Sequence, residues 1–147
     1  MADHDRPLNK RGRRDGPRMG TLIATQQIVP DMILSSPAER ARQTADAVAD
    51  VCDCRDRIEL IETLYLATAE TMIEILHGVS DRYETLMVVG HNPGMEQLLA
   101  ALTNAPAPMP TAALAELRLN IDRWRDIGGD GGAERVHLWL PRQLEAD

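Results

Sequence analysis

Runs of apolar residues, and their alternation with polar ones, predict several short strands along the chain. Residues 31–35 form a short apolar run between two prolines, and residues 86–90 form a continuous apolar run typical of a central parallel strand. Apolar and polar residues alternate over 58–66, which predicts another strand. Residues 112–120 and 135–140 flank a glycine-rich turn, which predicts an antiparallel pair.

Apolar residues at helical spacing predict helices between these strands. Residues 9–28 predict only a weak helix, because three glycines and Pro17 argue against a regular one. A stronger signal starts at Ser36, with Ser36 as N-cap, Pro37 at the first helical position and Glu39 completing a capping box, and runs to about residue 51. Residues 69–77 predict a third helix.

The last predicted helix follows Asn92 and Pro93, which have the residue types of an N-cap and a first helical position. Helices and strands therefore alternate, and this order predicts an α/β fold with three layers, in which helices cover both faces of a mainly parallel sheet. We expect a single domain over residues 1–147, with the proline-rich residues 105–110 forming a loop between its halves. Unusually, no strand is predicted before the first helix.

Composition narrows the classes of partner. The 147 residues carry a formal net charge of −7 and only four aromatic side chains, which disfavours nucleic acid as a partner. No apolar run is long enough to span a bilayer, and no secretory signal is evident, so we expect a cytoplasmic protein that does not bind membranes. Cys52 and Cys54 are interpreted as two reduced thiols. The basic residues between positions 6 and 18 are interpreted as a solvated helix face, the alternative being a rim that attracts an anionic substrate.

Two segments share a strand, a tight polar turn and the start of a helix, and these are the candidate sites of chemistry. They cover residues 34–40 and 89–94. Ligands of parallel sheets bind at the carboxyl ends of strands, where a helix N-terminus favours phosphate. Arg40 and His91 are therefore candidates to converge on one anion. Arginine offers a planar fork of donors, and histidine holds an oxygen or passes a proton near neutral pH.

Each candidate also has a plain structural interpretation. His91 is an ordinary turn residue in that interpretation, and Arg40 only pairs with Glu39 or Asp46. Ser36 is explained as a cap, and no Gly-x-Ser-x-Gly elbow supports a nucleophilic serine. The Asp3-His4-Asp5 run is interpreted as a loop, since no further metal ligands lie near it in the sequence. The histidines at positions 77 and 137 are interpreted as structural.

Four stretches together resemble the histidine phosphatase superfamily, which has the phosphoglycerate mutase-like fold, and its SixA-like phosphohistidine phosphatase branch in particular. They are Asp-Arg-Pro-Leu-Asn-Lys-Arg-Gly at 5–12, Ser-Ser-Pro-Ala-Glu-Arg-Ala-Arg-Gln-Thr at 35–44, Val-Val-Gly-His-Asn-Pro-Gly at 88–94 and Met-Pro-Thr-Ala-Ala at 109–113. The resemblance covers nearly the whole chain, with the four stretches in the family's order.

The resemblance implies a phosphate pocket formed by two arginines and two histidines. Arg40 would be the second pocket arginine and His91 the second pocket histidine, with Asn92 beside it, while Asp5 and Arg6 are candidates for the rim. It implies no metal and no other cofactor, because cationic side chains neutralise the phosphoryl group. The implied partner is a phosphorylated protein or small phosphorylated substrate, with protein phosphohistidine favoured. The oligomeric state and the general acid stay open, with Asp5 and Glu62 as candidates for the acid.

One family feature is absent from this sequence. The family's nucleophile is the histidine of an Arg-His pair at the end of its first strand, and here the four histidines follow Asp, Leu, Gly and Val. We expect that missing strand to be central, so that its absence leaves one side of the 86–89 strand unpaired. Two hypotheses follow. Either the natural protein starts upstream of Met1, or this is a catalytically inactive module that binds phosphate or a phosphoprotein.

Overall fold

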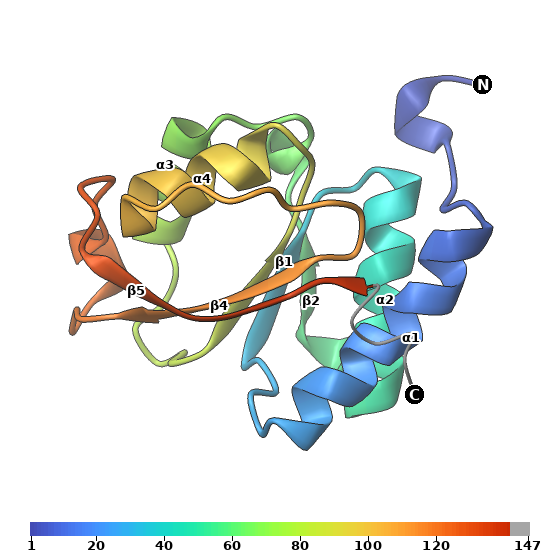
Figure 1. The fold of residues 1–147 in the computed structure, drawn as a ribbon, viewed down its shortest axis with the longest axis horizontal. Helices are drawn as coiled ribbons and strands as arrows, with labels where there is room; N and C mark the ends of the chain where they lie inside the picture. Colours follow the sequence, from blue (N-terminus) through green and yellow to red (C-terminus); the bar gives the residue numbers. More distant parts are fainter. Residues whose placement is uncertain (142–147) are drawn as a thin grey trace. The chain divides into compact units, whose positions relative to one another are not determined.

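The structure is a computed structural model that describes residues 1–141, and its chain forms two compact units (Figure 1). The first unit contains Met1–Tyr65 and Glu84–Gly90, and the second contains Leu66–Tyr83 and the chain from His91 onward. The first unit holds a parallel sheet with two helices, and the second holds two helices and an antiparallel strand pair. The predicted single domain over 1–147 stays a prediction.

The parallel sheet of the first unit contains β1 (Met32–Ser35), β2 (Ile58–Leu60) and β3 (Leu86–Val89) in the order β2-β1-β3. The predicted parallel strand over 86–90 is confirmed as β3, but β1 is the middle strand of the described sheet, because β1 pairs with both neighbours. Within residues 1–141, β3 pairs only with β1, as expected for a strand with one unpaired side. The predicted strand over 58–66 is also too long, since the chain leaves β2 for the 3-10 turn η3 (Glu62–Leu64).

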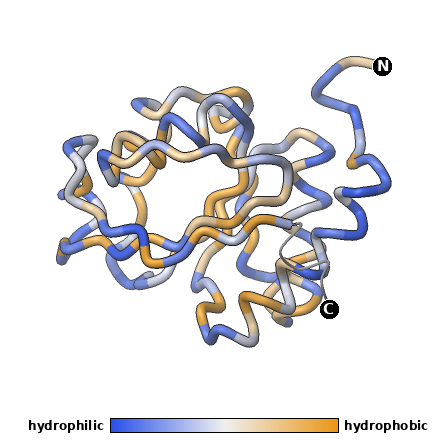
Figure 2. The backbone as a smooth tube through the Cα atoms, in the orientation of Figure 1, coloured by the Kyte–Doolittle hydropathy of each residue, from blue (hydrophilic) through white to orange (hydrophobic). Residues whose placement is uncertain are grey.

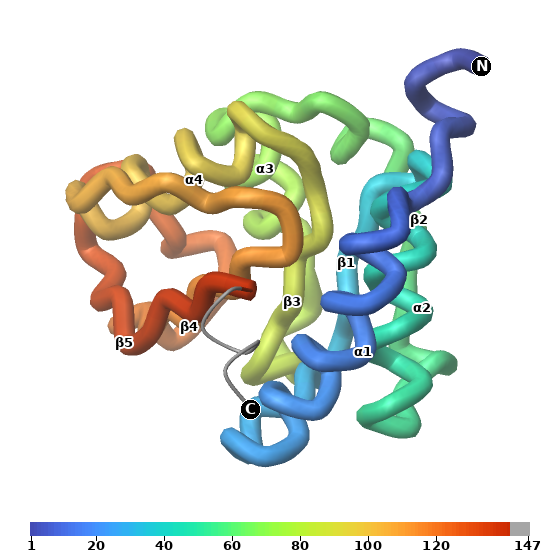
Figure 3. Tube along the Cα trace, turned by 45° about the vertical axis from the view of Figure 1, so that its right-hand side comes forward, coloured from blue at the N-terminus to red at the C-terminus, as the bar shows by residue number. Residues whose placement is uncertain are grey.

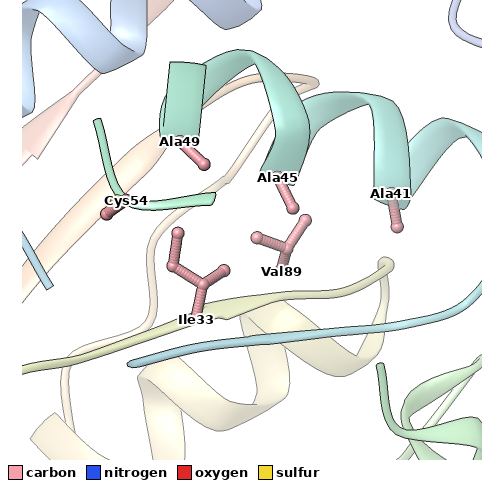
Figure 4. Packing of buried hydrophobic residues seen from close by; sticks show 6 residues of the cluster. All are labelled: Ile33, Ala41, Ala45, Ala49, Cys54 and Val89. Carbon is pink, nitrogen blue, oxygen red and sulfur yellow. The ribbon is translucent and has the colours of Figure 1, made fainter. Parts of the chain in front are cut away.

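Helix α2 (Glu39–Cys52) covers one face of this sheet with small side chains. Figure 4 shows Ala41, Ala45 and Ala49 of α2 directed toward Ile33 of β1 and Val89 of β3. All five side chains are less than one tenth exposed. Alanines bring the helix close to the sheet, and burial of the two β-branched residues supplies the apolar area that stabilises this contact.

Helix α1 (Lys10–Thr25) is continuous, and the prediction of an irregular helix is wrong. Its glycines have a packing role, because a Cβ at Gly16 would lie 3.0 Å from Ala47 Cβ and one at Gly20 would lie 2.9 Å from Val51 Cβ. The absent side chains thus let α1 approach α2, and Figure 3 shows the two helices side by side. Asn9 caps the helix by accepting from the backbone N–H of Gly12 at 2.9 Å.

Four of the basic residues of α1 form a solvated face, as predicted, whereas Arg18 is half-buried and lies 3.6 Å from the buried Asp15 carboxylate. Lys10, Arg11, Arg13 and Arg14 are exposed, and Figure 2 shows the first turns of the helix in the hydrophilic colours. The opposite face is buried through Met19 and Ile23. Helix α1 is therefore amphipathic despite its glycines.

The predicted capping box at the start of α2 is wrong. The helix begins at Glu39, and its N-cap residue Ala38 has no side-chain cap. Ser36 lies two residues earlier, where its hydroxyl accepts from the backbone N–H of Ala38 at 3.2 Å. This hydrogen bond stabilises the turn between β1 and α2. It occupies the Ser36 hydroxyl, which therefore does not cap α2.

The second unit contains α3 (Ala69–His77), α4 (Gly94–Thr103), β4 (Leu114–Leu119) and β5 (Ala133–Trp139) (Figure 1). The predicted helix over 69–77 is confirmed, as is the antiparallel pairing of β4 with β5, although that pair has a register shift at Glu116 and Leu117. Helix α4 begins where a close approach requires glycine, because a Cβ at Gly94 would lie 2.0 Å from the carbonyl oxygen of Ala67.

Candidate functional site

The carboxyl ends of β1 and β3 lie at the same edge of the parallel sheet. The two strands pair in register from Met32 with Leu86 to Ser35 with Val89, and the backbone N–H of Ser36 donates to the Val89 carbonyl at 3.0 Å. Ligands of parallel sheets bind at such an edge, beside the starts of the helices that follow. The candidate site therefore begins where both strands end.

Arg40 is the second residue of α2, and three residues separate this helix from the end of β1. Its guanidinium group contacts Asp3 twice: Nη1 donates to the Asp3 backbone carbonyl at 2.8 Å, and Nη2 lies 3.2 Å from Oδ2 of the Asp3 carboxylate. The carboxylates of Glu39 and Asp46, which the plain structural interpretation assigned to Arg40, lie 3.7 Å from Arg42 and 3.8 Å from Arg55. Arg40 thus already binds a carboxylate of its own chain.

Tyr65 is a member of this site that the sequence pattern does not predict. It follows η3, and its phenolic O–H donates to Asp3 Oδ2 at 2.5 Å. The hydrogen bond lowers the pKa of Asp3, and the ion pair with Arg40 lowers it further; the same bond raises the pKa of Tyr65. The alternation that predicted a strand through position 66 gave no signal for this role.

The Asp3-His4-Asp5 run is a short helical turn rather than a plain loop, and this corrects its interpretation. It forms the 3-10 turn η1 (Asp3–Asp5), which carries Asp3 onto Arg40 and places the His4 ring edge-on to Tyr65, with centroids 4.8 Å apart. Of the two predicted rim residues, Arg6 donates to Asp3 Oδ1 at 2.8 Å, whereas Asp5 is exposed and lies 3.7 Å from His4.

His91 and Asn92 belong to the second unit, whereas Arg40 belongs to the first. The His91 carbonyl accepts from the backbone N–H of Met95 at 2.9 Å, which fixes the backbone at the start of α4. Asn92 Nδ2 donates to the Met109 carbonyl at 2.7 Å, and its Oδ1 accepts from the Glu96 backbone N–H at 3.3 Å. Asn92 is thus not the predicted N-cap residue, a position that Pro93 occupies, but it still accepts a backbone hydrogen bond from the first turn.

Comparison with known proteins identifies the family of the chain. The sequence profile of the histidine phosphatase superfamily (branch 1) matches residues 1–67. An uncharacterised protein of Mycobacterium tuberculosis is 35% identical, over 97% of this chain and 93% of its own length. A provisionally assigned phosphohistidine phosphatase SixA of Agrobacterium tumefaciens is 30% identical, with a TM-score of 0.76 over 96% of this chain and 87% of its own. The chain belongs to the histidine phosphatase superfamily.

A second solved structure shares the fold at lower identity. It is a protein histidine phosphatase SixA complexed with tungstate, 22% identical, with a TM-score of 0.82 over 98% of this chain and 90% of its own. The predicted resemblance to the SixA-like branch of the histidine phosphatase superfamily is therefore confirmed, and so is the phosphoglycerate mutase-like α/β fold.

The remaining histidines of this histidine phosphatase homologue have structural contacts. His77 Nε2 lies 2.7 Å from the Ile127 carbonyl, and His137 Nδ1 lies 2.9 Å from Glu116 Oε1 while its ring stacks on Trp139. Over residues 1–141, no cluster of three or more His, Cys, Asp or Glu side chains is placed to hold a metal ion. The helices of the same residues include none that is long and apolar enough to cross a membrane.

Proposed function

We propose that this chain binds phosphoryl groups through Arg40 and His91, as the phosphate-binding part of a phosphatase that acts on protein phosphohistidine. The observation that carries the proposal is the position of Arg40 in the first turn of α2, with its guanidinium group on a carboxylate. A guanidinium group that contacts a carboxylate oxygen suits phosphate oxygens as well. The partial positive charge at the start of α2 favours the same anion.

In this proposal the two side chains have different roles. Arg40 binds two phosphoryl oxygens through its fork of donors and holds the group in place. His91 donates a hydrogen bond to a phosphoryl oxygen as negative charge builds during transfer, which lowers the barrier more than it strengthens ground-state binding. Asn92 orients the His91 segment through its bonds to Met109 and Glu96. These groups supply the neutralising charge, so no metal is required.

The covalent step requires a nucleophilic histidine. Its ring nitrogen attacks phosphorus, the P–N bond of the substrate breaks, and the released substrate imidazole takes up a proton. Water then attacks the phosphorylated histidine, which regenerates the ring and releases inorganic phosphate. We propose that none of the four histidines of residues 1–147 performs this attack, because none follows an arginine as in the family pattern. Residues 1–147 by themselves then bind phosphate without hydrolysing phosphohistidine.

The same observation favours a second candidate function, a module that binds a phosphorylated protein and has no catalytic role. Both candidates use Arg40 and His91 in the same way, and they differ only in whether a nucleophilic histidine is added from outside residues 1–147. Phosphohistidine is favoured as the group that is bound, because this chain is 30% identical to a protein assigned as a phosphohistidine phosphatase. A cytoplasmic location stays a prediction.

Binding of inorganic phosphate to residues 1–147, measured by isothermal titration calorimetry, tests the proposal. We expect saturable binding that Arg40→Ala weakens by about tenfold or more, since hydrogen bonds between charged groups are lost. Arg42→Ala is the matched control, because Arg42 lies in the same turn of α2, is half exposed and pairs with Glu39 rather than with Asp3 within residues 1–141. Equal affinities for the wild type and Arg40→Ala would refute the role of Arg40.

A further inference from the structure

The Asp3 carboxylate is surrounded by donors from three separate segments. Arg40 of α2 and Tyr65 after η3 both contact Oδ2, at 3.2 Å and 2.5 Å, and Arg6 donates to Oδ1 at 2.8 Å. Two guanidinium groups and a phenol around one small anion form an oxyanion receptor. In this structure an anionic side chain of the protein itself therefore occupies the receptor.

The two donors that do not belong to the N-terminal segment are both anchored at the end of β1. Arg40 follows β1 through the turn at Ser36, whose N–H donates to the Val89 carbonyl. Tyr65 follows η3, where the N–H of Ile61 donates to the Ser35 carbonyl at 2.9 Å and the Leu64 side chain is 2% exposed. The sheet therefore fixes Arg40 and Tyr65 relative to each other, whatever anion lies between them.

Asp3, in contrast, is held weakly. Its side chain is 45% exposed, and it lies in a three-residue turn with no buried residue. Exposed ion pairs contribute little to stability because water and salt screen them. A phosphoryl group carries more negative charge than a carboxylate and offers three acceptor oxygens, so it is able to displace Asp3 from both donors.

We propose that Tyr65 is a phosphate-binding residue, which donates its phenolic O–H to the phosphoryl oxygen beside Arg40, and that the Asp3 carboxylate occupies this position until phosphate displaces it. This inference rests on the proposed function, in which Arg40 binds the phosphoryl group. It adds a phenolic donor to the phosphate site, and it adds the Asp3 carboxylate as a competitor from the chain itself. Arg6 belongs to the displaced segment and moves with Asp3.

Phosphate affinity in a set of variants tests the inference, with calorimetry of inorganic phosphate as the measurement. Asp3→Asn removes the competing charge while keeping the side-chain shape, so we expect it to bind phosphate severalfold more tightly than the wild type. Adding Tyr65→Phe to Asp3→Asn should then weaken binding by about tenfold, because a hydrogen bond to a charged group is lost. The test of Tyr65 is made in the Asp3→Asn background because there Tyr65 no longer holds the competitor in place.

Two controls separate these effects from general changes in charge or aromatic content. Asp56→Asn removes one exposed negative charge from the unit that contains Asp3, and it should leave phosphate affinity unchanged. Tyr83→Phe, added to Asp3→Asn, should leave the phosphate affinity of the Asp3→Asn protein unchanged. Binding that depends on Arg40 but is insensitive to both Asp3→Asn and Tyr65→Phe would overturn this inference and leave the proposed function standing. No binding of phosphate by any of these proteins would overturn the proposed function, and this inference with it.

Discussion

Tyr65 donates a 2.5 Å hydrogen bond to the Asp3 carboxylate across 62 positions of sequence. The bond stabilises the charged form of Asp3 and lowers its pKa, while loss of the Tyr65 proton beside that carboxylate is disfavoured, which raises the pKa of Tyr65 above its ordinary value of 10.0. The two opposite pKa shifts share their largest cause, which is this hydrogen bond. They make the bond measurable in solution without any ligand.

The first prediction is that the Asp3 carboxylate raises the pKa of Tyr65 above its ordinary value. The chain has two tyrosines, so the Tyr83→Phe protein reports Tyr65 alone in an ultraviolet absorbance titration. We expect its midpoint to lie above 10.0 and to fall when Asp3→Asn is added. An unchanged midpoint after Asp3→Asn would show that the two side chains are not bonded in solution.

The second prediction concerns Asp31, which precedes β1 and connects it to the chain before β3. Its Oδ2 accepts from the backbone N–H groups of Glu84 at 2.8 Å and Thr85 at 3.0 Å. Asp31→Ala should lower the free energy of unfolding at neutral pH by about 1 to 2 kcal/mol, because both bonds are lost. Urea denaturation of the two proteins measures the difference.

The pH dependence of that difference has a definite sign. The Thr85 N–H first, and then the Glu84 N–H, lower the pKa of Asp31 below its ordinary 3.8, so the contribution is complete above this value and is lost as the pH falls through the lowered pKa. The difference in the free energy of unfolding between wild type and Asp31→Ala should thus become smaller below about pH 4. A gap that stays constant or widens there would contradict the assigned bonds. Asp56→Ala is the exposed control and should show no such gap.

The third prediction concerns Gly20, where α1 approaches α2. An alanine Cβ there would lie 2.9 Å from Val51 Cβ and 3.2 Å from Val48 Cα. Crowding at a packed contact costs about 1 to 3 kcal/mol, whereas alanine gains about 1 kcal/mol of helix propensity over glycine. Gly20→Ala should therefore lower the free energy of unfolding, by about 1 kcal/mol in the middle of these ranges.

Arg11→Ala is the control for Gly20→Ala, because Arg11 lies on the exposed face of the same helix. Exposed substitutions of this kind change the free energy of unfolding by less than about 0.5 kcal/mol. Chemical denaturation of both variants gives the comparison. A Gly20→Ala protein more stable than the wild type would mean that helix propensity, rather than the contact with α2, decides this position.

The fourth prediction is that the two thiols are protected in the folded chain. Burial raises the pKa values of both Cys52 and Cys54, and the Cys54 side chain is fully buried. Since the thiolate is the reactive form, iodoacetamide at neutral pH should alkylate Cys54 only after unfolding in urea, with half-buried Cys52 reacting first. Mass spectrometry of time points identifies the modified residue, and rapid alkylation of Cys54 in the native protein would refute its burial.

Sequence reasoning succeeded where a local pattern determines the structure. The apolar run over 31–35 and the turn that follows this run predict that Arg40 lies at the start of a helix, next to the end of a strand. The structure has Arg40 at that position. It failed where a contact between residues far apart in the sequence determines the local structure. Gly16 and Gly20 were interpreted as breaking the helix, because their packing against α2 is evident only in the structure. Tyr65 read as part of a strand, because its bond to Asp3 spans 62 positions and leaves no periodic signal.

The central claim is that Arg40 and His91 bind the same phosphoryl group. A nuclear magnetic resonance titration with inorganic phosphate tests it most directly, following the Arg40 side-chain Nε–H signal and the His91 imidazole signals in one sample. We predict that both sets of signals shift along a single saturable curve with one dissociation constant, and that Arg40→Ala abolishes the His91 shifts at the same phosphate concentrations. Shifts of Arg40 without His91, or two different dissociation constants, would contradict the claim.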